Sequence, residues 1–96
     1  MSETIDKAVQ ALNAKLDGAG FDGSAKFAIE GEGSIVLDQD GVRASDDDTE
    51  VTLTADVETF QDLLSGNLNA TSAFMTGRLK LDGDMGVAMR LGSVLS

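Results

Sequence analysis

Carboxylates, 17 in all, are the most numerous side chains that could do chemistry in this sequence of 96 residues. Histidine and cysteine are absent, which removes the commonest acid–base group, the thiol nucleophile, the disulfide and thiolate metal ligands. An enzyme would then need a carboxylate pair, a lysine, or a serine or threonine activated by lysine. The sequence offers no convincing set of this kind, so we expect a protein that is not an enzyme and holds no cofactor.

Two acidic segments are the only candidates for metal binding. Asp46, Asp47 and Asp48 lie together in a predicted turn, where a solvated acidic loop is the simpler interpretation. The segment 38–41 (DQDG) superficially resembles a calcium loop, but it lacks the third ligand and the downstream glutamate of an EF-hand. A hairpin turn explains it better. We expect no metal site. Weak calcium binding by these turns is kept as a minor hypothesis, behind the two functions given at the end of this section.

The net charge of −10 limits the partners of this chain. Seven scattered cations cannot displace counterions from nucleic acid, and attraction to anionic membranes is disfavoured for the same reason. No apolar run approaches the roughly 20 residues of a membrane span, and the first residues lack a signal-peptide pattern. We therefore expect no nucleic-acid partner, no stable membrane insertion and a cytoplasmic location.

The apolar periodicity changes twice along the chain. A helix is predicted up to Leu16, capped by Ser2 and ended by Gly18, because its apolar residues recur at helical spacing. Alternating patterns then predict four strands, which lie near residues 24–30, 35–37, 42–44 and 51–55. Short links between them indicate three successive hairpins, hence an antiparallel meander with one apolar face.

The second half supplies helices to cover that face. Asp56 is a predicted cap for a helix that Gly66 ends, and a short helical piece over 68–74 follows, capped by Asn69 or Thr71. A fifth strand carries Leu79 and Leu81 on one face, with Arg78 and Lys80 on the other. Those two cations face solvent or contact an anion. The segregation of strands from helices predicts a single α+β domain over residues 1–96.

The last predicted helix follows the cap Asp84 and is apolar almost all round. From Met85 to Leu95 only Arg90 is charged, and methionine also stands at positions 75 and 89. Methionine fills irregular cores and also lines adaptable apolar pockets. Full burial of such a helix is difficult in a domain of this size. The sequence leaves three interpretations open, namely a core helix, the wall of a ligand cavity, and a partner surface.

The block over residues 73–84 (AFMTGRLKLDGD), followed by this apolar helix, resembles the sterol-carrier, or non-specific lipid-transfer, protein family. The resemblance extends from about Ile5 to Leu95 and includes the segment 60–66 (FQDLLSG), which has one residue more than the family's pattern. It implies a five-stranded, predominantly antiparallel sheet with helices over one face. Between them it implies an apolar tunnel for fatty acids, fatty acyl-CoA, phospholipids or sterols.

The resemblance also implies which residues line that tunnel and what the chain does. The expected function is non-enzymatic binding or transfer of a lipid or acyl ligand. The alternative is a protein–protein interaction module that docks through the apolar C-terminal helix, as a homodimer would. The expected lining consists of eight residues carried over from the matching segments, which are Phe60, Leu64, Leu68, Phe74, Met75, Met85, Met89 and Leu91.

Overall fold

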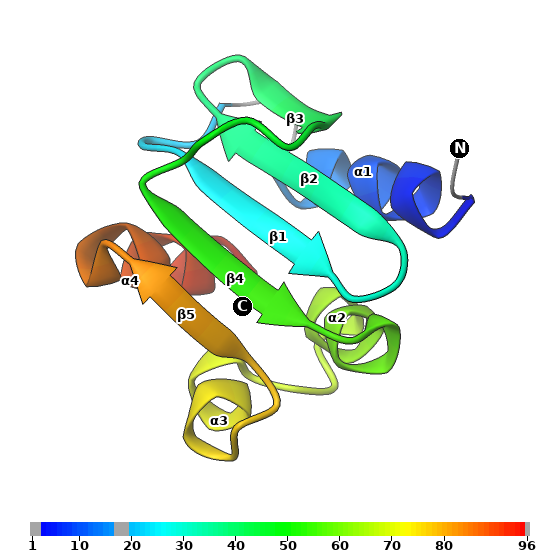
Figure 1. Ribbon diagram of the computed structural model, residues 1–96, viewed down its shortest axis with the longest axis vertical. Coiled ribbons are helices and arrows are strands. Elements are labelled where there is room, and N and C mark those ends of the chain that lie inside the picture. The colour runs from blue at the N-terminus through cyan, green and yellow to red at the C-terminus, as the bar shows by residue number, and fades with distance from the viewer. Residues whose placement is uncertain (1–2, 17–19, 96) are drawn as a thin grey trace.

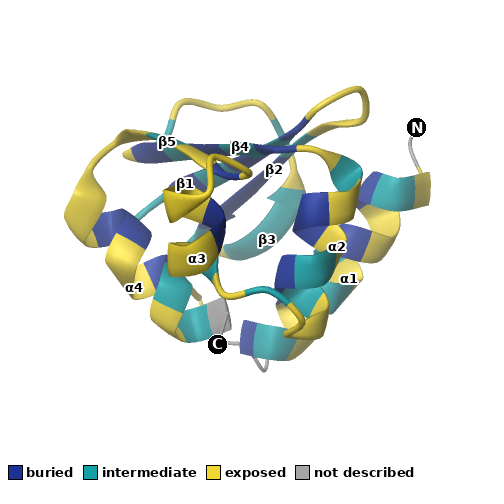
Figure 2. Cartoon of the chain, turned by 90° about the horizontal axis from the view of Figure 1, so that it is seen from below, coloured by how far each residue is buried: buried dark blue, intermediate teal, exposed yellow. Residues whose placement is uncertain are grey.

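The computed structural model describes residues 3–16 and 20–95, where four helices cover one face of a five-stranded sheet (Figures 1 and 2). This arrangement confirms the predicted α+β class and the single helical layer. In chain order the elements are α1 (Glu3–Leu16), β1 (Ala25–Ile29), β2 (Gly33–Asp38), β3 (Gly41–Ala44), β4 (Val51–Ala55), α2 (Val57–Ser65), α3 (Ala70–Met75), β5 (Lys80–Gly83) and α4 (Met85–Leu95).

The strands lie in the order β3-β2-β1-β4-β5, and β1 and β4 run parallel in the middle of the sheet. The other three pairs are antiparallel, so the predominantly antiparallel sheet is confirmed. The predicted four-strand meander is wrong, because β4 is not the neighbour of β3 in the sheet. It pairs instead with β1, where Phe27 lies opposite Leu53. Alternation fixes which face of a strand is buried, but it does not fix the neighbouring strand.

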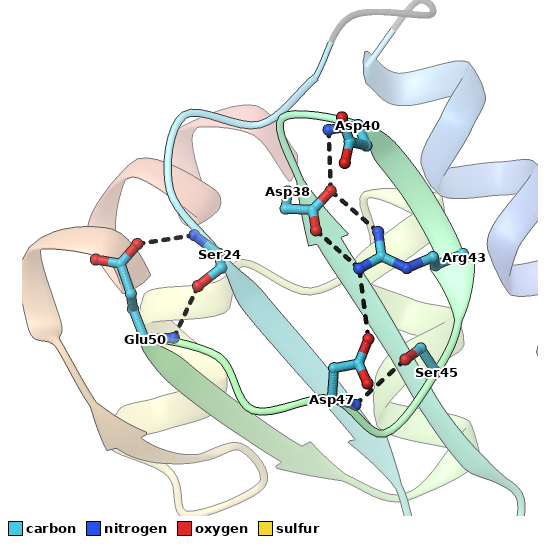
Figure 3. Close-up of polar contacts among 7 residues, drawn as sticks. All are labelled: Ser24, Asp38, Asp40, Arg43, Ser45, Asp47 and Glu50. Atoms are coloured by element: carbon cyan, nitrogen blue, oxygen red, sulfur yellow. Dashed lines mark hydrogen bonds and ion pairs between the residues drawn. The ribbon is translucent and has the colours of Figure 1, made fainter.

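The crossover over residues 45–50 passes on the side of the sheet away from the helices and is held by polar contacts (Figures 1 and 3). Arg43 Nη2 lies 2.9 Å from Asp38 Oδ2 and 3.6 Å from Asp47 Oδ2. At its end, the Ser24 amide donates to Glu50 Oε1 at 3.1 Å, and the Glu50 amide donates to Ser24 Oγ at 2.9 Å. These contacts fasten the crossover at both ends.

Helix ends in the second half confirm most of the predicted caps. Asp56 Oδ1 accepts from the Thr59 amide at 2.7 Å, and Gly66 closes α2 in the left-handed conformation with φ 84°. Asn69 caps α3, and Asp84 Oδ1 accepts from the amides of the first turn of α4. The predicted cap Ser2 and terminator Gly18 lie outside the described residues.

The core lies between the sheet and the helical layer. β1 and β4 bury every second residue against the helices, and α1 and α4 bury one stripe each. Burial of such side chains contributes about 1.5–3 kcal/mol each before the entropy cost of folding. The residues at the centre of this core are Leu12, Phe27, Ile35, Leu37, Val51, Phe60, Leu63 and Leu91.

Candidate functional site

A cavity of about 460 Å³ lies between the inner face of the sheet and the helices α3 and α4. Its volume falls in the range of about 300–1,000 Å³ that small-molecule sites occupy. The strands contribute its floor and the two helices its walls. The lining residues are Phe27, Leu53, Leu63, Asn69, Ala70, Thr71, Phe74, Leu79, Leu81, Met85, Ala88, Met89, Gly92 and Ser93.

The segment after α3 holds that helix in place beside the cavity. The amides of Arg78 and Leu79 both donate to the Ala73 carbonyl, at 2.9 and 3.1 Å. The Arg78 side chain reaches α2, where Nε donates to Thr59 Oγ1 and Nη2 donates to Asp62 Oδ2, both at 3.2 Å. The predicted place of Arg78 on the outer face of the fifth strand is therefore wrong. β5 begins only at Lys80, and Arg78 ties the segment to α2.

The cavity lining carries no charged side chain among the described residues. Its polar side chains are those of Asn69 and Thr71 at the start of α3 and Ser93 near the end of α4. These two helix ends are close, since a Cβ built on Gly92 would lie 3.9 Å from the Ala70 Cβ. The cavity thus has a polar end with hydrogen-bonding groups and a larger apolar part.

Three of the eight predicted lining residues, Phe74, Met85 and Met89, line this cavity. Met75 is 78% exposed on α3 and Leu91 is fully buried in the core, and neither lines it. Leu68 is half-buried against the core. The part that each of these residues plays in binding remains a prediction.

The other two predicted lining residues, Phe60 and Leu64, border a second hollow of about 410 Å³ between α1 and α2. Unlike the first cavity, this hollow has charged residues, Glu3 and Lys7, in its lining. The Phe60 ring packs against that of Phe27, with centroids 5.0 Å apart and planes inclined at 59°. Because Phe27 lines the first cavity and Phe60 the second, this aromatic pair lies between them. A continuous tunnel remains a prediction.

Sequence reasoning missed the floor of the cavity. Phe27 and Leu53 face each other across the parallel strand pair, and Leu81 lies opposite Leu53 on β5. Alternation predicts an apolar face on each of these strands, but it does not tell which residues of that face border a cavity. Knowledge of the strand order would have identified them, because all three residues lie in one row across the neighbouring strands β1, β4 and β5.

The rim of the cavity exposes large apolar side chains on α3 and α4. Phe74 is 44% exposed, Met85 49% and Met89 73%. Both helices lack acidic residues. A surface of this kind is typical of a binding site for apolar molecules.

The polar groups elsewhere perform structural tasks. Hydrogen bonding to Arg43 lowers the pKa of Asp38, and the Thr59 amide lowers the pKa of Asp56, and neither carboxylate lines the cavity. Over residues 3–16 and 20–95, no three acidic side chains are grouped as a metal site would require. The same residues include no helix with the length and hydropathy needed to cross a bilayer.

Two relatives show where such a chain occurs in larger proteins. Peroxisomal multifunctional enzyme A of Dictyostelium discoideum is 45% identical over 65 residues, which are 68% of this chain and 14% of that protein. Hydroxysteroid dehydrogenase-like protein 2 of Bos taurus is 30% identical over 97 residues, which cover 100% of this chain and 22% of that protein. The chain thus spans less than a quarter of either relative.

A solved structure shares the whole fold. Sterol carrier protein-2 of Aedes aegypti, solved as a complex with the fatty acid palmitate, superposes with a TM-score of 0.78. It is 22% identical, and the match covers 100% of this chain and 97% of that one. The SCP-2 sterol transfer family matches residues 3–96. This chain belongs to the SCP-2 sterol transfer family.

Proposed function

We propose that this chain binds lipids in the cavity between α3, α4 and the sheet and carries them without chemical change. The observation that supports this most directly is an uncharged cavity of about 460 Å³ with an exposed apolar rim. Membership of a sterol transfer family and the palmitate complex of the Aedes aegypti relative support the same proposal. The candidate ligands are fatty acids, fatty acyl-CoA, phospholipids and sterol-like molecules.

Affinity would come from burial of the hydrocarbon part. Each methylene transferred from water into an apolar site contributes about 0.8 kcal/mol, before the cost of ordering the chain and the rim. Apolar walls discriminate weakly between neighbouring chain lengths, so broad selectivity for the tail is expected. Release requires movement of α3 or α4, where the positive-φ residues Gly66, Gly77 and Gly83 mark the connecting turns.

The experiment that tests this proposal is native mass spectrometry of protein purified without detergent, followed by extraction of bound molecules. A lipid at one copy per chain is the expected result. Protein that arrives empty would then be titrated with an environment-sensitive apolar dye. Absence of both a co-purified lipid and saturable dye binding would refute the proposal.

The second candidate is an interaction module that docks through α4. The observation in its favour is the exposure of Met89 at 73%, on a helix with a single charge. A homodimer that Met89→Asp converts to a monomer, in a protein that binds no lipid, would favour this function. Size-exclusion chromatography with light scattering measures it. If the wild-type protein is a monomer, α4 does not serve to form a homodimer.

A further inference from the structure

We infer that the cavity selects amphiphiles with an uncharged, hydrogen-bonding head group over ionised fatty acids and acyl-CoA. Fatty alcohols, monoacylglycerols and sterols have such heads. This inference rests on the proposed function and narrows it to one ligand class.

The polar end offers hydroxyl and amide groups to a ligand. Asn69 Oδ1 accepts from the amides of Thr71 and Ser72 at 2.8 and 3.3 Å, which orients that side chain and leaves its NH₂ as a donor. The Thr71 hydroxyl beside it can both donate and accept. A neutral hydroxyl or carbonyl head can be satisfied there. Asn69 and Thr71 are exposed, so a carboxylate head there would keep its water but would find no cation among the lining residues.

The three cations in the last third of the chain are directed elsewhere. Arg78 contacts Thr59 and Asp62 on α2, and Arg90 Nη1 lies 3.0 Å from the Asp22 carbonyl and 3.6 Å from Asp22 Oδ2. Lys80 alternates with Leu81 on β5, and because Leu81 faces the cavity, Lys80 points to the opposite side of the sheet.

The charge of the chain acts in the same direction. A net charge of −10 repels an approaching anion, and a CoA head with its phosphates would be repelled more strongly than a single carboxylate. An uncharged head encounters no such barrier. The local and the global electrostatics therefore agree.

Matched ligands test this inference directly. Dodecanol, methyl laurate and laurate have the same saturated chain, and each would compete at pH 8 with an uncharged fluorescent dye already bound to the cavity. We expect both neutral ligands to bind several-fold more tightly than laurate, because the carboxylate finds no cation at this site and is repelled by the net charge of the chain. Equal or tighter binding of laurate would overturn the inference and leave the proposed function intact. Failure of all three to displace the dye would refute the proposed function itself.

A positive charge introduced at the polar end of the cavity provides a second test, which concerns the location of the head group. Thr71 is exposed and lines the cavity, so Thr71→Lys places a cation there with little risk to folding, and Thr71→Gln is its uncharged control. We expect Thr71→Lys to bind laurate several-fold more tightly than Thr71→Gln does, and we expect dodecanol affinity to differ much less between these two variants, because both lack the hydroxyl. A laurate affinity that is the same in both variants would count against the assigned location of the head group.

Discussion

Single side chains fix where the helices beside the cavity begin. Asp56, Asn69 and Asp84 each accept hydrogen bonds from the first free amides of the helix that follows. Such caps satisfy donors that the helix itself leaves unpaired. Asp56 and Asp84 were predicted as caps from sequence, and Asn69 as one of two candidates with Thr71, because a cap depends on neighbours only two or three positions away. The cap residues thereby determine the positions of the walls.

The Asp56 cap makes a pH-dependent contribution to stability. The Thr59 amide lowers the pKa of Asp56 below its ordinary value of 3.8, so the folded state favours the carboxylate. This stabilisation is fully present above pH 3.8 and is lost as the pH falls through the lowered pKa. We expect Asp56→Ala to lower the melting temperature at pH 7 by a few degrees and to lose this effect in acid.

Asp56→Asn is the control for charge, because its amide oxygen still accepts from Thr59. Thermal melts from pH 7 down to pH 3 would measure both variants. A deficit of Asp56→Ala that persists unchanged at the lowest pH would contradict the assigned role of the carboxylate.

At the scale of elements, the space between the sheet and the helices α3 and α4 forms the cavity. Gly92 lies on α4 where a Cβ would make an ordinary 3.9 Å contact with the Ala70 Cβ. We expect Gly92→Phe to place its ring in the cavity and to weaken lipid binding by at least about tenfold, the equivalent of two lost methylenes. Gln61→Phe adds the same ring beside the second hollow and serves as the matched control. Dye titration of both folded variants measures the difference, and equal losses would contradict the assigned site.

The turn between β5 and α4 depends on a glycine for two reasons. Gly83 has φ 119°, and a Cβ there would collide with the Glu50 carbonyl and lie 2.9 Å from the Val51 Cα. Gly77 has a similar positive φ of 81° but open space around it. We expect Gly77→Ala to cost about 1–2 kcal/mol from backbone strain and Gly83→Ala to cost more, because β4 must also move. Urea unfolding of the pair measures this, and equal costs would show that the clash relaxes freely.

The sequence predicted elements better than their arrangement. Caps, turns and apolar faces depend on local chemistry, and the helices from Val57 onward were predicted nearly to their ends. The position of β4 was not predicted, because its pairing with β1 is set by residues distant in the chain. The cavity floor was missed for the same reason. Phe27 and Leu53 look like ordinary core residues until the parallel pair places them beside Leu81.

At the scale of the whole molecule, charge and site are separated along the chain. Fifteen of the 17 acidic residues precede residue 67, whereas the last 30 residues hold three cations and two carboxylates. Eleven of the 14 lining residues therefore lie in the nearly neutral third of a strongly acidic chain. Salt screens the repulsion between the acidic chain and an anionic ligand, because the screening length falls from about 30 Å at 0.01 M to about 3 Å at 1 M.

This separation predicts a specific response to salt. We expect the ratio of dodecanol affinity to laurate affinity to fall as sodium chloride rises from 0.01 to 1 M. Salting-out strengthens the binding of both ligands equally, because their alkyl chains are identical. The ratio of the two affinities therefore reports only the effect of the carboxylate charge. Dye displacement across the salt series measures it. A constant ratio would mean that the chain's overall field does not contribute.

The exposed thioethers at the cavity rim have a redox consequence. Met85 and Met89 line the cavity and are 49% and 73% exposed, which leaves both sulfur-bearing side chains open to peroxide. Oxidation to the sulfoxide makes such a side chain polar, and reductases reverse it. Because neither residue belongs to the core, the fold would survive while the rim lost its affinity for hydrocarbon. Oxidant exposure would then release cargo from an intact protein, and enzymatic repair would restore its capacity to load.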